Sequence, residues 1–140
     1  MKRTDLAYSA GLFDGEGCIQ IIKTKRGPNR RLQYYLRCTL EMANEHLPRL
    51  LQVHFGGHVR HRKLPLPRQN QWEWVVASHA AADFLEVIYP YLILKKGEAD
   101  VGLKFQASLQ TNSSKARVTD EQWAVREAQR IVLQGLKRKQ

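Results

Sequence analysis

One stretch near the start of the chain, residues 6–19 with the sequence LAYSAGLFDGEGCI, constrains the fold more than any other. Small and apolar residues recur in it at helical spacing, and Thr4 is a suitable N-cap, so a helix is predicted over Thr4–Phe13. The stretch ends in two acids between glycines, Asp14-Gly15-Glu16-Gly17, and the glycines are predicted to end the helix. The apolar CIQII follows directly and is typical of a strand. A helix, two carboxylates and a strand must therefore meet within a few residues.

The remainder of the chain alternates between hairpins and helices. Four strands are predicted, at residues 18–25, 32–42, 58–63 and 71–77. Helices are predicted at residues 45–55 and 78 to about 94, with Asn44 and Ser78 as N-caps and a break near Pro90, then at 98–109 and after a capping box at 119–122. This αββαββα order with added C-terminal helices indicates an α+β fold, in which helices cover one face of an antiparallel sheet. We expect residues 1–110 to form the core and 111–140 to add a linker and a helix to the same domain.

The charge of the chain is its most unusual compositional property. The formal net charge is +10 and the pI is about 10, which indicates a polyanionic partner, nucleic acid first and an anionic membrane second. Between Lys23 and Arg68 there are eleven Lys and Arg residues and only two acids, Glu41 and Glu45. The basic excess therefore lies on the two hairpins, whose open, twisted face is predicted to form a saddle over a DNA groove.

The sequence disfavours several other classes of protein. The longest apolar run, residues 84–94, is too short to span a bilayer and contains Pro90, so no membrane partner is expected. The N-terminus lacks the apolar core of a signal peptide, and Cys18 and Cys38 are interpreted as reduced thiols of an intracellular protein. No spacing of cysteines and histidines suggests a zinc site, and no small-molecule cofactor is predicted.

Strand alternation divides the side chains between the two faces of the sheet. The face toward the helices is predicted to carry Ile19, Ile21, Leu36, Cys38, Leu40, Met42, Val59, Trp72, Trp74 and Val76. The open face is predicted to contact DNA through Gln20, Ile22, Thr24, Arg26, Tyr35, Arg37, Thr39, Glu41, Arg60, Arg62, Gln71 and Glu73, with Arg30, Arg31 and Arg68 from the hairpin ends. Arginines on that face suit the edges of guanines.

Residues 9–17, SAGLFDGEG, resemble the signature motif of the LAGLIDADG homing endonucleases. The αββαββα order is similar to the core of that family. Three further stretches fit it: GHVRHR as the third strand, WEWVV as the fourth, and PYLILKKGEADVGLKFQ as the late helical segment. The resemblance covers residues 6–109. The motif is found once, and single-motif members resemble homodimers, whereas double-motif members are single chains.

The resemblance implies a homodimeric, site-specific endonuclease that hydrolyses both strands of DNA with Mg²⁺ at a long pseudo-palindromic target. Ca²⁺ is then expected to support binding without cleavage. Such a protein is expected in an organelle, a chloroplast or a mitochondrion, or in a bacterial cytoplasm, and its gene is expected to be intron-encoded or free-standing rather than part of an intein. Four small or acidic residues of the first helix recur at three- and four-residue spacing and are predicted to form the dimer interface: Ala7, Ala10, Gly11 and Asp14.

The resemblance also implies roles for individual residues. Glu16 matches the family's metal-binding acid, although it is Glu where the motif has Asp, and Gly15 beside it is the second candidate for the metal site. Lys95 matches a lysine that stabilises the phosphoanion or perturbs the attacking water. Asn44 matches a polar group that positions water, in an alignment that needs a gap.

The candidate site residues and the function of the chain each have an alternative interpretation. Glu16 can also be read as a solvated acid, Lys95 as a surface lysine with Lys96 as the competing match, and Asn44 as a simple N-cap. A non-catalytic nucleic-acid-binding protein on the same scaffold, an intron maturase or a transcription regulator, would need the basic saddle but not the acid. A basic RNA-associated structural protein would prefer structured RNA and would need no two-fold axis.

Overall fold

The computed structural model describes residues 1–110 and 118–138 of the chain. Its elements follow the predicted αββαββα order with further C-terminal helices. They are α1 (Arg3–Glu16), β1 (Gly17–Arg26), β2 (Arg31–Met42), α2 (His46–Phe55), β3 (His58–Arg62), β4 (Gln71–Ala77), α3 (Ser78–Ile88), a short 3-10 helix η1 (Tyr89–Tyr91), α4 (Lys96–Gln110) and α5 (Asp120–Arg138).

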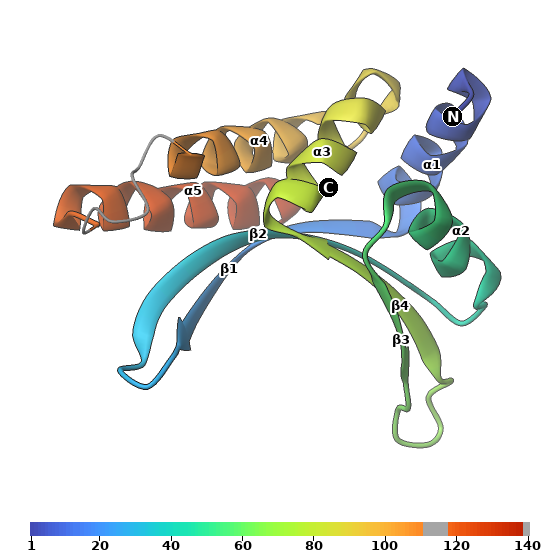
Figure 1. The fold of residues 1–140 in the computed structure, drawn as a ribbon. Coiled ribbons are helices and arrows are strands. Elements are labelled where there is room, and N and C mark those ends of the chain that lie inside the picture. The colour runs from blue at the N-terminus through green and yellow to red at the C-terminus, as the bar shows by residue number, and fades with distance from the viewer. Residues whose placement is uncertain (111–117, 139–140) are drawn as a thin grey trace.

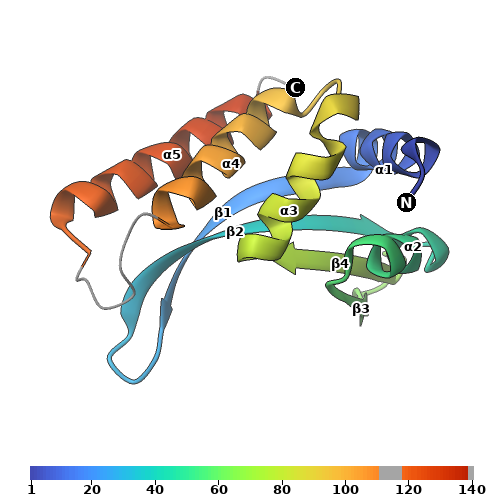
Figure 2. The same cartoon turned by 45° about the horizontal axis from the view of Figure 1, so that its top comes forward.

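The four strands form one antiparallel sheet in the order β1-β2-β4-β3. The sheet bends into an arch, with the tips of its two hairpins at opposite ends (Figure 1). The five α-helices of the described residues lie on the convex side, with α4 and α5 side by side above β1, so no helix in that part of the chain covers the concave face (Figure 2). The prediction of an α+β fold with one covered and one open face is confirmed.

The core lies between the sheet and the helices, and one aromatic cluster joins four elements there. Phe84 of α3 makes edge-to-face contacts with Phe13 of α1, Phe55 of α2 and Trp74 of β4, at centroid distances of 5.0, 4.8 and 4.9 Å. Each such contact contributes about 0.5–1.5 kcal/mol beyond burial alone. The cluster fixes α1, and with it the acidic residues at its end, against the sheet.

The ends of α1 differ from the prediction. The helix begins at Arg3 rather than after a Thr4 cap, and the Lys2 backbone N–H donates to the Asp5 carboxylate at 3.0 Å. It does not stop before Gly15 but continues to Glu16, so both acids lie in its last turn. Gly17 starts β1 in ordinary extended backbone (φ −84°); it is glycine because a Cβ there would lie 2.2 Å from Cδ1 of the buried Phe13 ring.

Two other helix boundaries also shift. Helix α3 ends at Ile88 instead of continuing to about Leu94, because Pro90 lies in η1 and cannot continue the α-helical hydrogen bonds. Ser78 is the first residue of α3, with φ +55°, and Ala77 is in the cap position. Helix α2 begins at His46, with Glu45 rather than Asn44 in the cap position, one residue later than predicted. Asn44 precedes the cap, and its Oδ1 accepts a hydrogen bond from the backbone N–H of His46 at 2.7 Å.

Helix α5 is attached to the β1–β2 hairpin by one charged cluster. Glu127 accepts hydrogen bonds from the Tyr34 hydroxyl at 2.5 Å and twice from Arg130, and Lys23 Nζ lies 3.5 Å from its carboxylate. Hydrogen bonds from Arg130 and Tyr34 lower the pKa of Glu127 to about 2, and burial and the Glu127 contact raise the pKa of Tyr34 to about 12.

The capping box that opens α5 is confirmed by reciprocal bonds between Thr119 and Gln122. Residues 111–117 of the predicted linker lie outside the described residues, and the division at residue 110 stays a prediction.

The Glu127 cluster predicts a specific pH dependence. The pKa of Glu127 is lower in the folded chain than its unfolded value of about 4.3, so its contribution is present above that pH and is lost as the pH falls toward 2. Glu127→Gln should lower the free energy of unfolding by about 1 kcal/mol at pH 7 and by much less near pH 2, as expected for a partly exposed ion pair. Urea unfolding between pH 2 and 7 measures this; an equal loss at all pH values would contradict it.

The close approach of Gly17 to Phe13 predicts a strong effect of one methyl group. Gly17→Ala should destabilise the chain by about 1–3 kcal/mol, because the Phe13 ring is fully buried and can move only at the expense of the core. Gly135→Ala in α5 is the matched control, since a Cβ there meets no atom within 4 Å. Thermal unfolding of both variants tests this, and equal melting temperatures would refute the steric argument.

Candidate nucleic-acid interface and active site

The open face of the sheet carries the polar side chains that alternation assigns to it. The residues between them are buried on the helix side, among them Ile19, Leu36 and Trp74. All twelve strand residues predicted for DNA contact therefore lie on the concave face: Gln20, Ile22, Thr24, Arg26, Tyr35, Arg37, Thr39, Glu41, Arg60, Arg62, Gln71 and Glu73. Arg30 lies in the turn before β2, Arg31 is the first residue of β2, and Arg68 lies in the loop between β3 and β4. The exposed arginines at the hairpin ends extend the positive charge along the arch.

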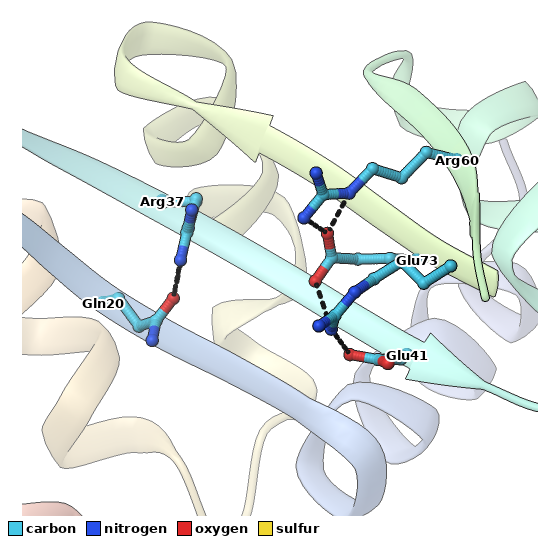
Figure 3. Close-up of polar contacts among 6 residues, drawn as sticks. Gln20, Arg37, Glu41, Arg60 and Glu73 are labelled. Atoms are coloured by element: carbon cyan, nitrogen blue, oxygen red, sulfur yellow. Dashed lines mark hydrogen bonds and ion pairs between the residues drawn. The ribbon is translucent and has the colours of Figure 1, made fainter. Parts of the chain in front are cut away.

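Side chains on this face hold one another in place (Figure 3). Arg37 donates from Nε and Nη2 to Gln20 Oε1, its cross-strand partner, at 3.1 and 2.7 Å. Arg60 makes the same kind of contact with Glu73 at 2.7 Å, and Arg62 lies 2.7 Å from Glu41 and 3.8 Å from Glu73. The face therefore presents arginines in fixed orientations.

The position of Glu73 changes its expected role. The sequence predicts that it contacts DNA, but the side chain of Glu73 is only 11% exposed under Arg60 and Arg62, although it lies on the open face. Its oxygens are used by the two guanidinium groups. Alternation gives the face of a residue but not the neighbours that cover it.

The two acids at the end of α1 have different environments. Both carboxylate oxygens of Asp14 accept hydrogen bonds from consecutive backbone N–H groups of Ile93, Leu94 and Lys95, at 2.7, 3.2 and 3.0 Å. Glu16, the last residue of the helix, is exposed, and within the described part of the chain its carboxylate makes no hydrogen bond or ion pair. Asp14 therefore serves the fold, and Glu16 is the acid that can bind a ligand.

Lys95 lies at the same end of α1. Its side chain is buried, and Nζ donates to the Asp14 main-chain carbonyl at 3.1 Å. The last turn of α1 contains no basic residue, so Lys95 supplies the cation that the partial negative charge of a helix C-terminus favours. The structure thus brings together Lys95 and the motif acids, which are about 80 positions apart in the sequence.

The oxygen atoms at this helix end suit a hard divalent cation. The Glu16 carboxylate and the main-chain carbonyls of the last helical turn, including that of Gly15, point to such a site, because terminal carbonyls lack intrahelical partners. Within residues 1–110 and 118–138, no group of three or more His, Cys, Asp and Glu side chains forms a complete metal cage. Mg²⁺ needs only one or two carboxylates together with phosphate oxygens and water. The donor set fits Mg²⁺ if DNA, or a second chain, completes it.

The four residues predicted for the dimer face differ in their exposure in the single chain, and the dimer face itself stays a prediction. Ala7 and Gly11 are exposed, and a Cβ on Gly11 or Gly15 would meet no atom within 4 Å. Ala10 is instead fully buried in the core of its own chain, and Asp14 is used as described above. The exposed stripe that contains Ala7 and Gly11 continues through Tyr8 and reaches the neighbouring Ile93 and Leu94. The sequence did not predict these three residues as part of the dimer face. The three- and four-residue spacing could not show which side of α1 faces its own sheet.

A model of the LAGLIDADG endonuclease family matches residues 9–100, which include the acidic motif, both hairpins and Lys95. A search of curated proteins finds 28% identity over 96 residues to reverse gyrase from Thermococcus kodakarensis, a match that spans 67% of this chain but only 5% of that protein. Among the helices that the structure describes, none is long and apolar enough to cross a membrane.

Several solved structures share the fold. The homing endonuclease I-CvuI, crystallised in complex with its target in the presence of Ca²⁺, aligns over 96% of this chain and 95% of its own, with a TM-score of 0.62 and 20% identity. The homing endonuclease I-TnaI aligns over 95% and 93%, with a TM-score of 0.70 and 15% identity. The meganuclease I-SmaMI, bound to DNA, aligns over 94% of this chain but 45% of its own, with a TM-score of 0.72 and 18% identity. Together with the family match, which covers more than half of the sequence, these likenesses lead to one conclusion: the chain belongs to the LAGLIDADG endonuclease family.

Proposed function

We propose that the chain is a homodimeric, Mg²⁺-dependent endonuclease that cuts both strands of DNA at a specific, long, pseudo-palindromic site. The observation that carries this proposal is the end of α1, where an exposed Glu16 and a buried Lys95 lie at the start of a polar, concave sheet. An acid for the metal and a cation for the phosphate thus lie beside the surface that would hold the duplex.

The concave sheet supports DNA as the substrate. Its curvature and its arginines suit a duplex groove, where strands can contact base edges. Related structures contain DNA: I-CvuI in complex with its target and the archaeal intron-encoded I-Vdi141I complexed with DNA. As part of the same proposal, the chain acts on DNA inside an organelle or a bacterium. Its gene is then expected to be intron-encoded or free-standing.

A second copy would complete both the site and the target. The chain aligns with nearly all of I-CvuI but with less than half of I-SmaMI, so it supplies one saddle of four strands. Pairing through the exposed stripe of α1 would bring the two Glu16 carboxylates together on a two-fold axis. Two saddles in line would cover on the order of two helical turns of a pseudo-palindrome.

Each residue of the site has a distinct part in the reaction. When bound, Mg²⁺ would activate water and stabilise the leaving oxygen during phosphodiester hydrolysis. Glu16, with the Gly15 carbonyl, would hold it against the scissile phosphate. Lys95 would stabilise the negative charge that develops on that phosphate, from a position fixed by its bond to the Asp14 carbonyl. Asn44 would orient water through its amide nitrogen, because its oxygen accepts the hydrogen bond from the His46 backbone N–H.

Removal of the Glu16 charge should strongly slow cleavage and leave the fold unchanged. Glu16→Gln should lower the cleavage rate by about 100-fold or more, the scale seen when one electrostatic group leaves an active site. Its melting temperature should match the wild type, since the carboxylate is exposed. Asp14→Asn is the contrasting variant and should lower the melting temperature, because three backbone N–H groups depend on its carboxylate.

The measurement is selection and cleavage of a randomised duplex library in Mg²⁺, Ca²⁺ and EDTA. Cleavage of one enriched sequence in Mg²⁺ alone supports the enzyme. Enrichment without any cleavage by the wild type would replace it with a non-catalytic DNA-binding protein, and enrichment of structured RNA only would replace DNA as the substrate.

The dimer can be tested through one exposed glycine. Gly11→Leu should weaken self-association about tenfold or more, because overpacking a close helix contact costs about 1–3 kcal/mol. The single chain should tolerate it, since a Cβ on Gly11 meets nothing within 4 Å. Sedimentation of this variant and of Ala128→Leu, at an exposed position of α5, provides the comparison. A monomeric wild type, or equal association of all three proteins, would argue against this interface.

A further inference from the structure

Three neighbouring strands carry a row of charges across the open face. Arg60 of β3 lies directly opposite Glu73 of β4, and Glu73 lies directly opposite Glu41 of β2. Two like charges in opposite positions destabilise a sheet, so packing alone does not account for the pair of glutamates. Arg60 and Arg62 offset their repulsion through the ion pairs at 2.7 Å (Figure 3).

The contacts leave a defined edge of each guanidinium free. Arg60 uses Nε and Nη2 toward a single oxygen, Oε1 of Glu73, and its side chain is 64% exposed. The Nη1 and Nη2 hydrogens at its tip therefore remain available. Arg62 contacts the glutamates through Nη1, which leaves its Nε and Nη2 edge. Either edge can donate two parallel hydrogen bonds to O6 and N7 of guanine.

The cluster contributes orientation rather than net charge. Two arginines and two glutamates sum to zero, so the row adds little to the attraction of phosphates, which depends on net positive charge. Arginine side chains that are free to rotate lose entropy when they bind a base, and a fixed guanidinium has already lost part of it. The row is therefore suited to discriminate bases.

The strand register places the row near the end of α1. Glu41 follows Leu40, which pairs with Gly17, and Glu16 immediately precedes Gly17. The row of Arg60, Glu73 and Glu41 thus leads toward the strand edge where Glu16 lies. Bases contacted from this row belong to the part of each half-site nearer the cleaved centre.

We propose that Glu73, assisted by Glu41, is a positioning residue that fixes Arg60 and Arg62 to recognise guanines in the inner part of each half-site. This inference rests on the proposed function, since it assigns specificity within the same DNA interface. Glu73 contacts no base: its carboxylate is covered by the arginines it holds. The DNA contacts are made by the arginines.

The test is a binding selection from a randomised duplex library in Ca²⁺, read by sequencing, with the wild type and four variants. Arg60→Ala and Arg62→Ala locate the guanine positions that each arginine recognises. Glu73→Gln should reduce the preference for guanine at those positions about tenfold or more, with other positions unchanged. The affinity of this variant for random duplex should be equal or higher, because each chain loses one negative charge and its net charge rises by one. Glu45→Gln is the matched control: it removes an acid paired with Arg49 on α2, away from this face, and should leave every preference unchanged.

Each outcome separates the inference from the proposed function. If Glu73→Gln keeps the guanines that the alanine variants lose, the positioning role is wrong while the endonuclease proposal stands. A cytosine preference lost only in Glu73→Gln would mean that Glu73 contacts DNA itself, and would also overturn it. No enrichment by the wild type would overturn the proposed function. If Glu73→Gln does not fold, Glu73→Asp, which keeps the charge but shortens its reach to Arg60, should show the same loss of guanine preference.

Discussion

The hydrogen bonds of Asp14 with the backbone of residues 93–95 connect the two segments that carry the candidate site. They join the last turn of α1 to the segment before α4, so the helix that carries Glu16 and the loop that carries Lys95 form one unit. The aromatic cluster around Phe84 holds the same helix against the sheet. Asp14 therefore has a structural role, whereas the exposed Glu16 is the acid of the motif that is accessible to the metal ion we propose.

The charges of the chain are divided in a similar way. Lys23, on the helix side of β1, attaches the first hairpin to α5 through Glu127. On the other side, Arg60 and Arg62 are neutralised and oriented by glutamates, whereas the arginines at the hairpin ends stay exposed. The concave face thus combines exposed positive charge at the hairpin ends, which favours polyanions, with arginines on β3 that are held in fixed orientations.

Local patterns predicted the fold well because they depend on neighbours in sequence. Alternation identified Leu36 and Trp74 as core residues, and the resemblance singled out Lys95, which lies against α1. Contacts between distant segments could not be inferred in the same way. Nothing in the sequence links Asp14 to residues 93–95, and the spacing of Ala10 fits an interface as well as its own core. Likewise, the covering of Glu73 depends on two arginines from another strand.

The proposed metal site is tested most directly by anomalous scattering from Mn²⁺ in a crystal of the chain bound to the DNA that it selects. We expect two copies of the chain on one duplex, with the metal signal bounded by Glu16 carboxylates on the two-fold axis and by phosphate oxygens. A metal bound away from Glu16, or one copy of the chain on a complete target, would contradict it.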